Sequence, residues 1–291
     1  MNEQEKFGRQ ENFFVSKERW GEELSSMALP EEDIRSVKLQ EFLPQIPADP
    51  AMPVSELVDR CLQALKQTSI SPEERKLLAD VTTEEIDGIM APYAERLAAL
   101  IKESGKTSVS IVSLGCGSSG HIEQILDQHI KQELGDAITV EWLGIETNDK
   151  RTEDSFFRDH PFTAIPPSEA PQYASLAEED SLRLLIANYS YHHLGRSFEE
   201  FVAQCKGMDR VIMLEHPVTK EKWADPVHRV AKTSYDILVN EAIDPEWISQ
   251  AGLSSDVFKV NYLLEEEIPK DSTVMRFPSV VPGSAIIDFK P

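Results

Sequence analysis

Residues 111–120 read IVSLGCGSSG, an apolar run that leads into a loop with three glycines. Gly115, Gly117 and Gly120 have the spacing GxGxxG, and the sequence after them, HIEQILDQHIKQEL, has the apolar periodicity of a helix. Glycine permits a tight turn and a close approach of the backbone to a ligand. The stretch therefore predicts a strand, a ligand-binding turn and a helix. Because several classes of nucleotide-binding protein share GxGxxG, the motif alone does not name the ligand.

Strand-like and helix-like segments alternate in the rest of this half of the chain. Strands are expected at AITVEWLGIE, LRLLIANYS, DRVIMLEH, VFKVNYLL and one segment within STVMRFPSVVPGSAIIDF. Helices are expected at FEEFVAQC, residues 226–241 and residues 245–251, and residues 151–180 are expected to form a proline-rich loop. Such alternation predicts an α/β fold with a mainly parallel sheet and helices on both faces.

The first 104 residues have a different pattern. Residues 1–53 are expected to form an arm, because prolines recur every third residue in PQIPADPAMP and favour an extended chain. Apolar residues that could anchor the arm are Phe13, Phe14, Val15 and Trp20. Residues 54–104 have helical periodicity. We therefore expect an N-terminal arm and helical extension over residues 1–104, acting as a lid or a homodimer contact, and an α/β domain over residues 105–291.

Charge and composition exclude several classes of function. The chain has 51 acidic and 29 basic residues, a net charge of -22, which would repel nucleic acid. No apolar run approaches the roughly 18 residues of a membrane helix, and the polar start MNEQEKFGRQ does not resemble a signal peptide. The three cysteines, Cys61, Cys116 and Cys205, lack the spacing of a metal site. We expect a cytoplasmic protein with free thiols, no metal, and a small molecule as substrate.

An acidic residue stands at the end of the second expected strand. Glu146, in WLGIETND, lies 26 residues after Gly120. A carboxylate at this place can accept hydrogen bonds from both hydroxyls of a ribose. Together with the glycine loop, Glu146 predicts the binding of a nucleoside.

These segments resemble the motifs of class I S-adenosylmethionine-dependent methyltransferases. SLGCGSSGHIEQIL is similar to the first motif of the family, LGIETND to the second strand with its ribose-binding acid, and LLIANYSYHHL to the fourth strand. VIMLEHP resembles the fifth strand, and PEWISQAGLSSDVFKV resembles the helix, glycine and sixth strand that follow. The resemblance covers roughly residues 105–291. It implies a Rossmann-like sheet of seven strands with an antiparallel last hairpin.

The resemblance also implies the ligand and its contacts. The cofactor would be S-adenosyl-L-methionine, bound by Gly115, Cys116, Gly117, Gly120, Glu146, Asn188 and Tyr189. An enzyme of the NAD-binding Rossmann type is disfavoured, because the HHL element after the fourth strand belongs to the methyltransferase pattern. One position departs from the family: Ser113 stands where an acidic residue often precedes the first glycine by two places. From that position we expect a weaker contact with the methionine ammonium.

Candidate catalytic residues cluster after the fourth and fifth strands. The segment 188–193 is expected to end at the sulfonium of the cofactor. A histidine or tyrosine there could remove a proton from the acceptor, since the pKa of histidine lies near neutrality. The candidates are Tyr191, His192, His193 and His216.

Three functions remain open from the sequence. The first is methyl transfer to a small-molecule acceptor. The second is transfer or cyclisation of the aminobutyrate part of S-adenosylmethionine, for example to azetidine-2-carboxylate, with release of methylthioadenosine. Aromatic and polar groups around the sulfonium would suit that reaction. The third is a nucleotide-binding or partner-binding module without catalysis, against which the intact glycine loop and Glu146 argue.

Overall fold

The structure is a computed structural model that describes residues 13–147, 149, 151–165, 170–251, 260–278 and 283–291. The chain forms two compact units, one of Met1–Ala79 with Glu221–Phe258 and one of Asp80–Lys220 with Lys259–Pro291. This division differs from the expected boundary after residue 104. Residues 221–258 belong with the N-terminal helices, because the long helix within them packs against three of those helices.

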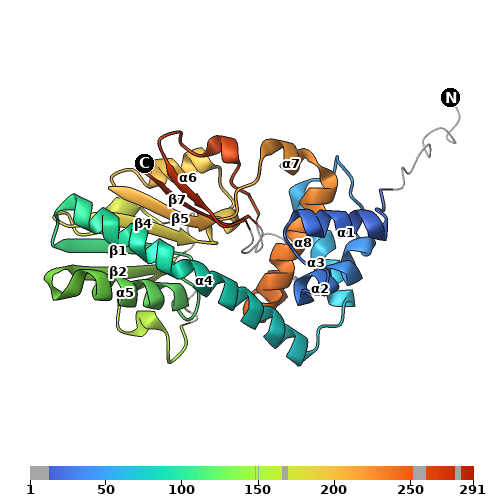
Figure 1. Cartoon of the computed structure of the whole chain (residues 1–291), viewed down its shortest axis with the longest axis horizontal. Helices are drawn as coiled ribbons and strands as arrows, with labels where there is room; N and C mark the ends of the chain where they lie inside the picture. The colour runs from blue at the N-terminus through green and yellow to red at the C-terminus, as the bar shows by residue number, and fades with distance from the viewer. Residues whose placement is uncertain (1–12, 148, 150, 166–169, 252–259, 279–282) are drawn as a thin grey trace, which may run out of the picture. The chain divides into compact units, whose positions relative to one another are not determined.

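The second unit contains a seven-stranded sheet with the order β3-β2-β1-β4-β5-β7-β6 (Figure 1). Strand β7 is antiparallel to β5 and β6, and the other pairs are parallel. This arrangement confirms the fold that the sequence predicted. The strands are β1 (Ser108–Leu114), β2 (Thr139–Glu146), β3 (Phe162–Ala164), β4 (Leu182–Asn188), β5 (Arg210–Glu215), β6 (Thr273–Arg276) and β7 (Ala285–Phe289).

Helices cover both faces of the sheet, and the alternation of side chains along β1 shows how. Ile111 packs with residues of α4 (Pro72–Ser104) and α5 (His121–Leu134) on one face. Val112 packs with Phe201 of α6 (Phe198–Gln204) on the other. Successive side chains of a strand point to opposite faces, so a strand buried on both faces is apolar throughout. Short 3-10 helices complete the unit: η3 (Gly135–Ala137), η4 (Phe156–Arg158), η5 (Tyr173–Leu176), η6 (Tyr191–His193) and η7 (Glu265–Glu267).

One expectation about strands was wrong, and a second was wrong for the part of it that the structure describes. The proline-rich segment 151–180 contains β3, whose three residues pair with the end of β2. The segment VFKVNYLL begins outside the described residues, and its described part, residues 260–264, forms only a bridge from Leu264 to Val218. Tyr262 and Leu263 are nevertheless buried. An apolar run can therefore mark packing without marking a strand.

The other unit is helical. Its elements are α1 (Lys17–Ser26), α2 (Ile34–Phe42), η2 (Leu43–Gln45), α3 (Val54–Gln67), the start of α4, α7 (Lys220–Ala224), α8 (Pro226–Ile243) and α9 (Pro245–Ala251). Residues 1–12 of the expected arm lie outside the described residues. For residues 13–53 the expectation of an arm was wrong, because that range contains α1 and α2. Both helices bury apolar side chains against α8, Trp20 and Leu24 from α1 and Leu39 and Phe42 from α2. The role of the N-terminal extension, residues 1–104, as a lid or a homodimer contact stays a prediction.

No helix in the described part of the chain is long and apolar enough to span a membrane.

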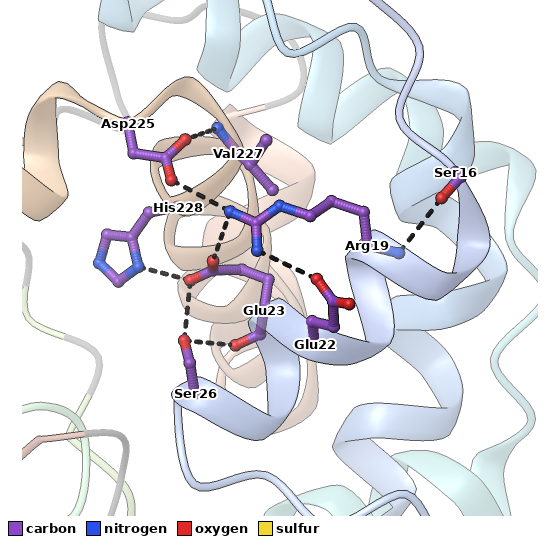
Figure 2. A network of polar contacts seen from close by, with 8 residues as sticks. All are labelled: Ser16, Arg19, Glu22, Glu23, Ser26, Asp225, Val227 and His228. Atoms are coloured by element: carbon purple, nitrogen blue, oxygen red, sulfur yellow. Dashed lines mark hydrogen bonds and ion pairs between the residues drawn. The ribbon is translucent and has the colours of Figure 1, made fainter.

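A buried carboxylate joins α1 to α8 in the helical unit (Figure 2). An oxygen of Glu23 lies 2.7 Å from Nδ1 of His228 and 3.2 Å from the hydroxyl of Ser26. Arg19 lies 3.8 Å from Glu23 and 3.4 Å from Asp225, at the start of α8. The hydrogen bond from His228 lowers the pKa of Glu23. The network therefore stabilises the contact between the two helices while Glu23 is ionised.

Replacement of this carboxylate should change both the stability of the protein and its pH dependence. We expect Glu23→Gln to lower the free energy of unfolding at neutral pH by about 1–3 kcal/mol, since a hydrogen bond to a charged group is lost. A lowered folded-state pKa stabilises the protein above the ordinary value of 4.5, and this stabilisation is lost as the pH falls below it. Urea unfolding between neutral and acidic pH should therefore show a shallower acid decline in Glu23→Gln than in the wild type. The exposed neighbour gives the control, Glu22→Gln, and an equal effect of both variants would contradict the prediction.

Candidate active site

The loop between β1 and α5 is a tight turn, as the three glycines predicted. Gly115, Gly117 and Gly120 have φ angles of 68°, 66° and 63°, in the left-handed region that favours glycine. A Cβ at Gly115 would lie 2.4 Å from Cβ of Ser190, and one at Gly120 would lie 2.9 Å from the ring of Phe157. A Cβ at Gly117 would meet no atom within 4 Å. Two of the glycines therefore permit packing, and Gly117 leaves the backbone open to a ligand.

Cys116 lies between the first two glycines with its side chain turned inward. Its thiol is buried against the carbonyl of Ile145, and burial raises the pKa of the thiol. Gly144 makes room for it, because a Cβ there would lie 3.0 Å from Sγ. The side chain of Cys116 thus supports the turn, and its cofactor contact stays a prediction.

The carboxylate of Glu146 lies beside this loop at the end of β2. Its Oε2 accepts a hydrogen bond from the amide of Gly117 at 3.1 Å, and its Oε1 accepts one from the amide of Thr147 at 2.7 Å. Each carboxylate oxygen has a second lone pair. Glu146 can therefore still accept hydrogen bonds from two ribose hydroxyls, next to the open position at Gly117. The residues present fit the nucleoside part of S-adenosylmethionine.

The side chain of Asn188, at the end of β4, is held in a buried network. Its Oδ1 accepts a hydrogen bond from the hydroxyl of Tyr93 at 2.9 Å, and its Nδ2 donates one to Glu123 at 3.2 Å. Glu123 also accepts a hydrogen bond from the hydroxyl of Ser113 at 2.6 Å. The predicted cofactor contact of Asn188 would therefore use an oxygen that already has a donor.

The sequence analysis missed Tyr93 and Glu123. One signal for Glu123 was available, because it stands on the apolar stripe of α5 with Leu126, Asp127 and Ile130. An acidic residue on a buried stripe needs a specific partner, which points to a polar network.

Tyr189, the next residue, has a φ of 49°. A tyrosine in the left-handed region is strained, and such strain clusters at functional sites. Two bonds hold the conformation: the amide of Tyr189 donates to the carbonyl of Leu214 at 2.7 Å, and its hydroxyl lies 2.6 Å from that of Ser284. The sharp turn brings the following residues back toward the ends of β1 and β5.

A histidine and a glutamate form a buried pair at the ends of β4 and β5. Nδ1 of His192 lies 2.9 Å from Oε2 of Glu215, and the other oxygen of Glu215 accepts a hydrogen bond from the amide of Tyr191 at 2.9 Å. The carboxylate of Glu215 therefore holds the imidazole of His192 in one orientation.

The other predicted histidines lie around this pair. The ring of His192 is 3.9 Å from that of His193 and 4.6 Å from that of His216, measured between centroids. Tyr262 stacks on His192 at 5.6 Å. The structure thus brings the three histidines together, with Tyr189 beside His216 at 5.7 Å. Glu215 and Tyr262 were not predicted as site residues. Glu215 stands in VIMLEHP, but its partner His192 lies after another strand, and Tyr262 belongs to no local motif.

Tyr191 is placed differently from the histidines. Its ring is fully buried and packs against Phe198 and Phe201, 5.8 and 5.3 Å away. Burial raises the pKa of its hydroxyl. The ring belongs to the core on the α6 face of the sheet, and a catalytic role for Tyr191 stays a prediction.

Comparison with known proteins bears on the fold. No protein-family model and no curated protein matches the chain. Solved structures of S-adenosylmethionine-dependent methyltransferases do match it. The plantazolicin methyltransferase BpumL, in complex with a triazolic desmethylPZN analog and SAH, is 11% identical over 81% of this chain and 96% of its own, with a TM-score of 0.42. The magnesium protoporphyrin IX methyltransferase ChlM from Synechocystis PCC 6803, with bound SAM, is 10% identical over 82% and 98%, with a TM-score of 0.37.

A SAM-dependent methyltransferase from Aquifex aeolicus is 9% identical over 76% of this chain and 98% of its own, with a TM-score of 0.32. These likenesses are distant and concern the fold alone. We therefore interpret the site from the contacts of this chain.

The different surroundings of the glycines predict different effects of adding a methyl group. Both Gly115→Ala and Gly117→Ala place a side chain in the left-handed region, at a cost of about 1–2 kcal/mol. Gly115→Ala also drives its Cβ into Ser190, so we expect it to lose about 1–3 kcal/mol more than Gly117→Ala. Urea denaturation of the two variants measures the difference. Equal losses would show that the loop relaxes around Gly115 at no cost.

Proposed function

We propose that this protein is an S-adenosylmethionine-dependent methyltransferase that acts on a small-molecule acceptor. The observation that carries the proposal is the position of Glu146 beside the open backbone at Gly117. In an open α/β sheet, ligands bind at the carboxyl ends of the strands where the strand order reverses. Here that point lies between β1 and β4, and the glycine loop and the segment after Asn188 flank it.

The bound cofactor would supply an electrophilic methyl group on a sulfonium. Gly117 and Glu146 would hold its nucleoside part, through the loop backbone and the carboxylate. His192, oriented by Glu215, would accept the proton of the acceptor as the acceptor's oxygen or nitrogen bonds to the methyl carbon, and the electron pair of the broken S–CH3 bond would stay on the sulfur of the thioether product. Stacking of Tyr262 on His192 fixes the plane of the imidazole. The acceptor would therefore be a compound with a hydroxyl or amine proton to lose.

The charge of the chain supports a small acceptor. A net charge of -22 disfavours nucleic acid, whose binding depends on basic groups. It disfavours a strongly anionic acceptor for the same reason.

A second candidate function is aminobutyrate transfer or cyclisation with release of methylthioadenosine. The aromatic and imidazole rings of Tyr189, His192, His216 and Tyr262 support it, because they lie together after β4 and β5. Such rings can stabilise a sulfonium by cation–π contact. The two reactions leave different products, which makes them separable.

Loss of the carboxylate charge of Glu146 should weaken cofactor binding. We expect Glu146→Gln to reduce the affinity for S-adenosylhomocysteine by about 1–3 kcal/mol, since a charge-assisted hydrogen bond to the ribose is lost. Isothermal titration calorimetry measures the change. The matched control is Glu141→Gln, on the same strand but exposed. Unchanged affinity in Glu146→Gln would remove Glu146 from the site.

The products of the reaction should identify its type. With S-adenosylmethionine alone we expect no turnover above an enzyme-free control, because methyl transfer requires an acceptor. Added small hydroxyl and amine compounds should include one that yields S-adenosylhomocysteine. Glu215→Gln should lower that rate by about 100-fold or more, since a positioned base contributes about 10²- to 10⁴-fold. Chromatography of the reaction mixtures measures both. Enzyme-dependent methylthioadenosine from the cofactor alone would establish the second candidate function instead.

A further inference from the structure

Glu123 is a buried carboxylate whose hydrogen-bond donors are neutral groups. It stands in the first turn of α5 with 2% of its surface exposed. Its Oε1 accepts hydrogen bonds from the hydroxyl of Ser113 and the amide of Asn188. The hydroxyl of Tyr93 extends the network through Asn188. Burial raises the pKa of Glu123, because removal from water disfavours the charged form, and the hydrogen bonds from Ser113 and Asn188 offset only part of this effect.

Glu123 differs from the other buried carboxylates of the described chain in the kind of group that lies next to it. Five of the six buried Asp and Glu residues lie within 4 Å of a histidine, lysine or arginine: Glu23 with His228, Asp127 with Lys131, Glu215 with His192, Asp236 with Lys232, and Asp288 with Arg96 and Arg210. Within the same described residues, Glu123 has no such partner. A buried carboxylate without a cation carries a large desolvation cost. The partial positive charge at the N-terminus of α5 offsets only part of that desolvation cost.

The position of Glu123 is where a ligand of this fold would bind. Ser113 lies one residue before the end of β1, and Asn188 ends β4. The chain runs outward from β1 through β2 to β3 and then crosses to β4 on the other side, so the strand order reverses between β1 and β4. Through its bonds to Ser113 and Asn188, Glu123 connects β1 and β4 at that point. The glycine loop begins at Gly115, directly after the last residue of β1.

We propose that Glu123 binds the primary ammonium group of the cofactor's aminobutyrate part. This assignment rests on the proposed function and adds to it the residue that neutralises the ammonium. Ser113 and Asn188 hold the carboxylate in place through its Oε1. The ammonium of the ligand would then be the positively charged partner of Glu123.

Two ligands that differ only in the ammonium test this assignment. One is S-adenosylhomocysteine, and the other is 5′-S-(3-carboxypropyl)-5′-thioadenosine, the same molecule without its α-amino group. Calorimetry with the full-length wild-type protein should show tighter binding of S-adenosylhomocysteine by about 10- to 100-fold, the range for a charged hydrogen bond.

Glu123→Gln should abolish this preference while leaving the affinity for the deaminated analogue unchanged. The substitution keeps the shape of the side chain and an oxygen that accepts from Ser113 and Asn188. Because it removes an unpaired buried charge, its melting temperature without ligand should be equal to or higher than that of the wild type. Glu123→Asp retains the charge and should keep part of the preference.

The control is Asp127→Asn, which changes a buried acid one turn further along α5 that has its own cation. It should lower stability and leave the ligand preference intact. Equal weakening of both ligands by Glu123→Gln, or no weakening of either, would overturn the assignment while leaving the proposed function in place. Absence of binding of S-adenosylhomocysteine by the wild type would overturn both.

An inorganic cation is tested separately, by titration with magnesium chloride alone. Binding that Glu123→Gln abolishes would assign the carboxylate to a metal and overturn the ammonium assignment.

Discussion

The contact between Gly115 and Ser190 holds the ends of β1 and β4 together, and the site depends on it. Ser190 packs directly on the Cα of Gly115, and its hydroxyl donates to the carbonyl of Leu114 at 2.7 Å. No residue with a side chain could replace Gly115 without moving one of the two chains. This close approach places Glu123 within reach of Asn188 and leaves Gly117 at the open rim of the turn. Binding groups from separate segments thus meet where Gly115 leaves room for the side chain of Ser190.

Much of the fold could be predicted from local sequence. Strands β1, β4 and β5 are mostly apolar, which indicates burial on both faces of a parallel sheet. The errors have physical reasons. Strand β3 has three residues, too few for a periodicity, and residues 260–264 are apolar because they pack, although they form no strand. The helices in residues 1–53 were missed because the proline spacing was given more weight than the apolar spacing of α1 and α2.

Part of the candidate site could be predicted from the sequence, and part could not. The glycine loop and Glu146 follow a local motif, so their proximity could be predicted from sequence. The hydrogen bond from Tyr93 to Asn188 joins residues 95 positions apart, and the pair of His192 and Glu215 joins two different strand ends. Such contacts depend on the packing of the whole unit, which spacing does not encode. Sequence indicated the residue types, and the fold determined their partners.

The helical unit is assembled from two distant parts of the chain, and this has a consequence for synthesis. Helices α1, α2 and α3 leave the ribosome first, but the partner for their apolar faces, α8, is made after the strands β1 to β5. Until then Trp20, Leu39 and Phe42 lack the helix that covers them. Contacts of such high sequence separation form slowly, and exposed apolar surface favours aggregation meanwhile. The nascent chain thus carries an incomplete N-terminal unit while its sheet is being made, and chaperone dependence during translation would be concentrated there.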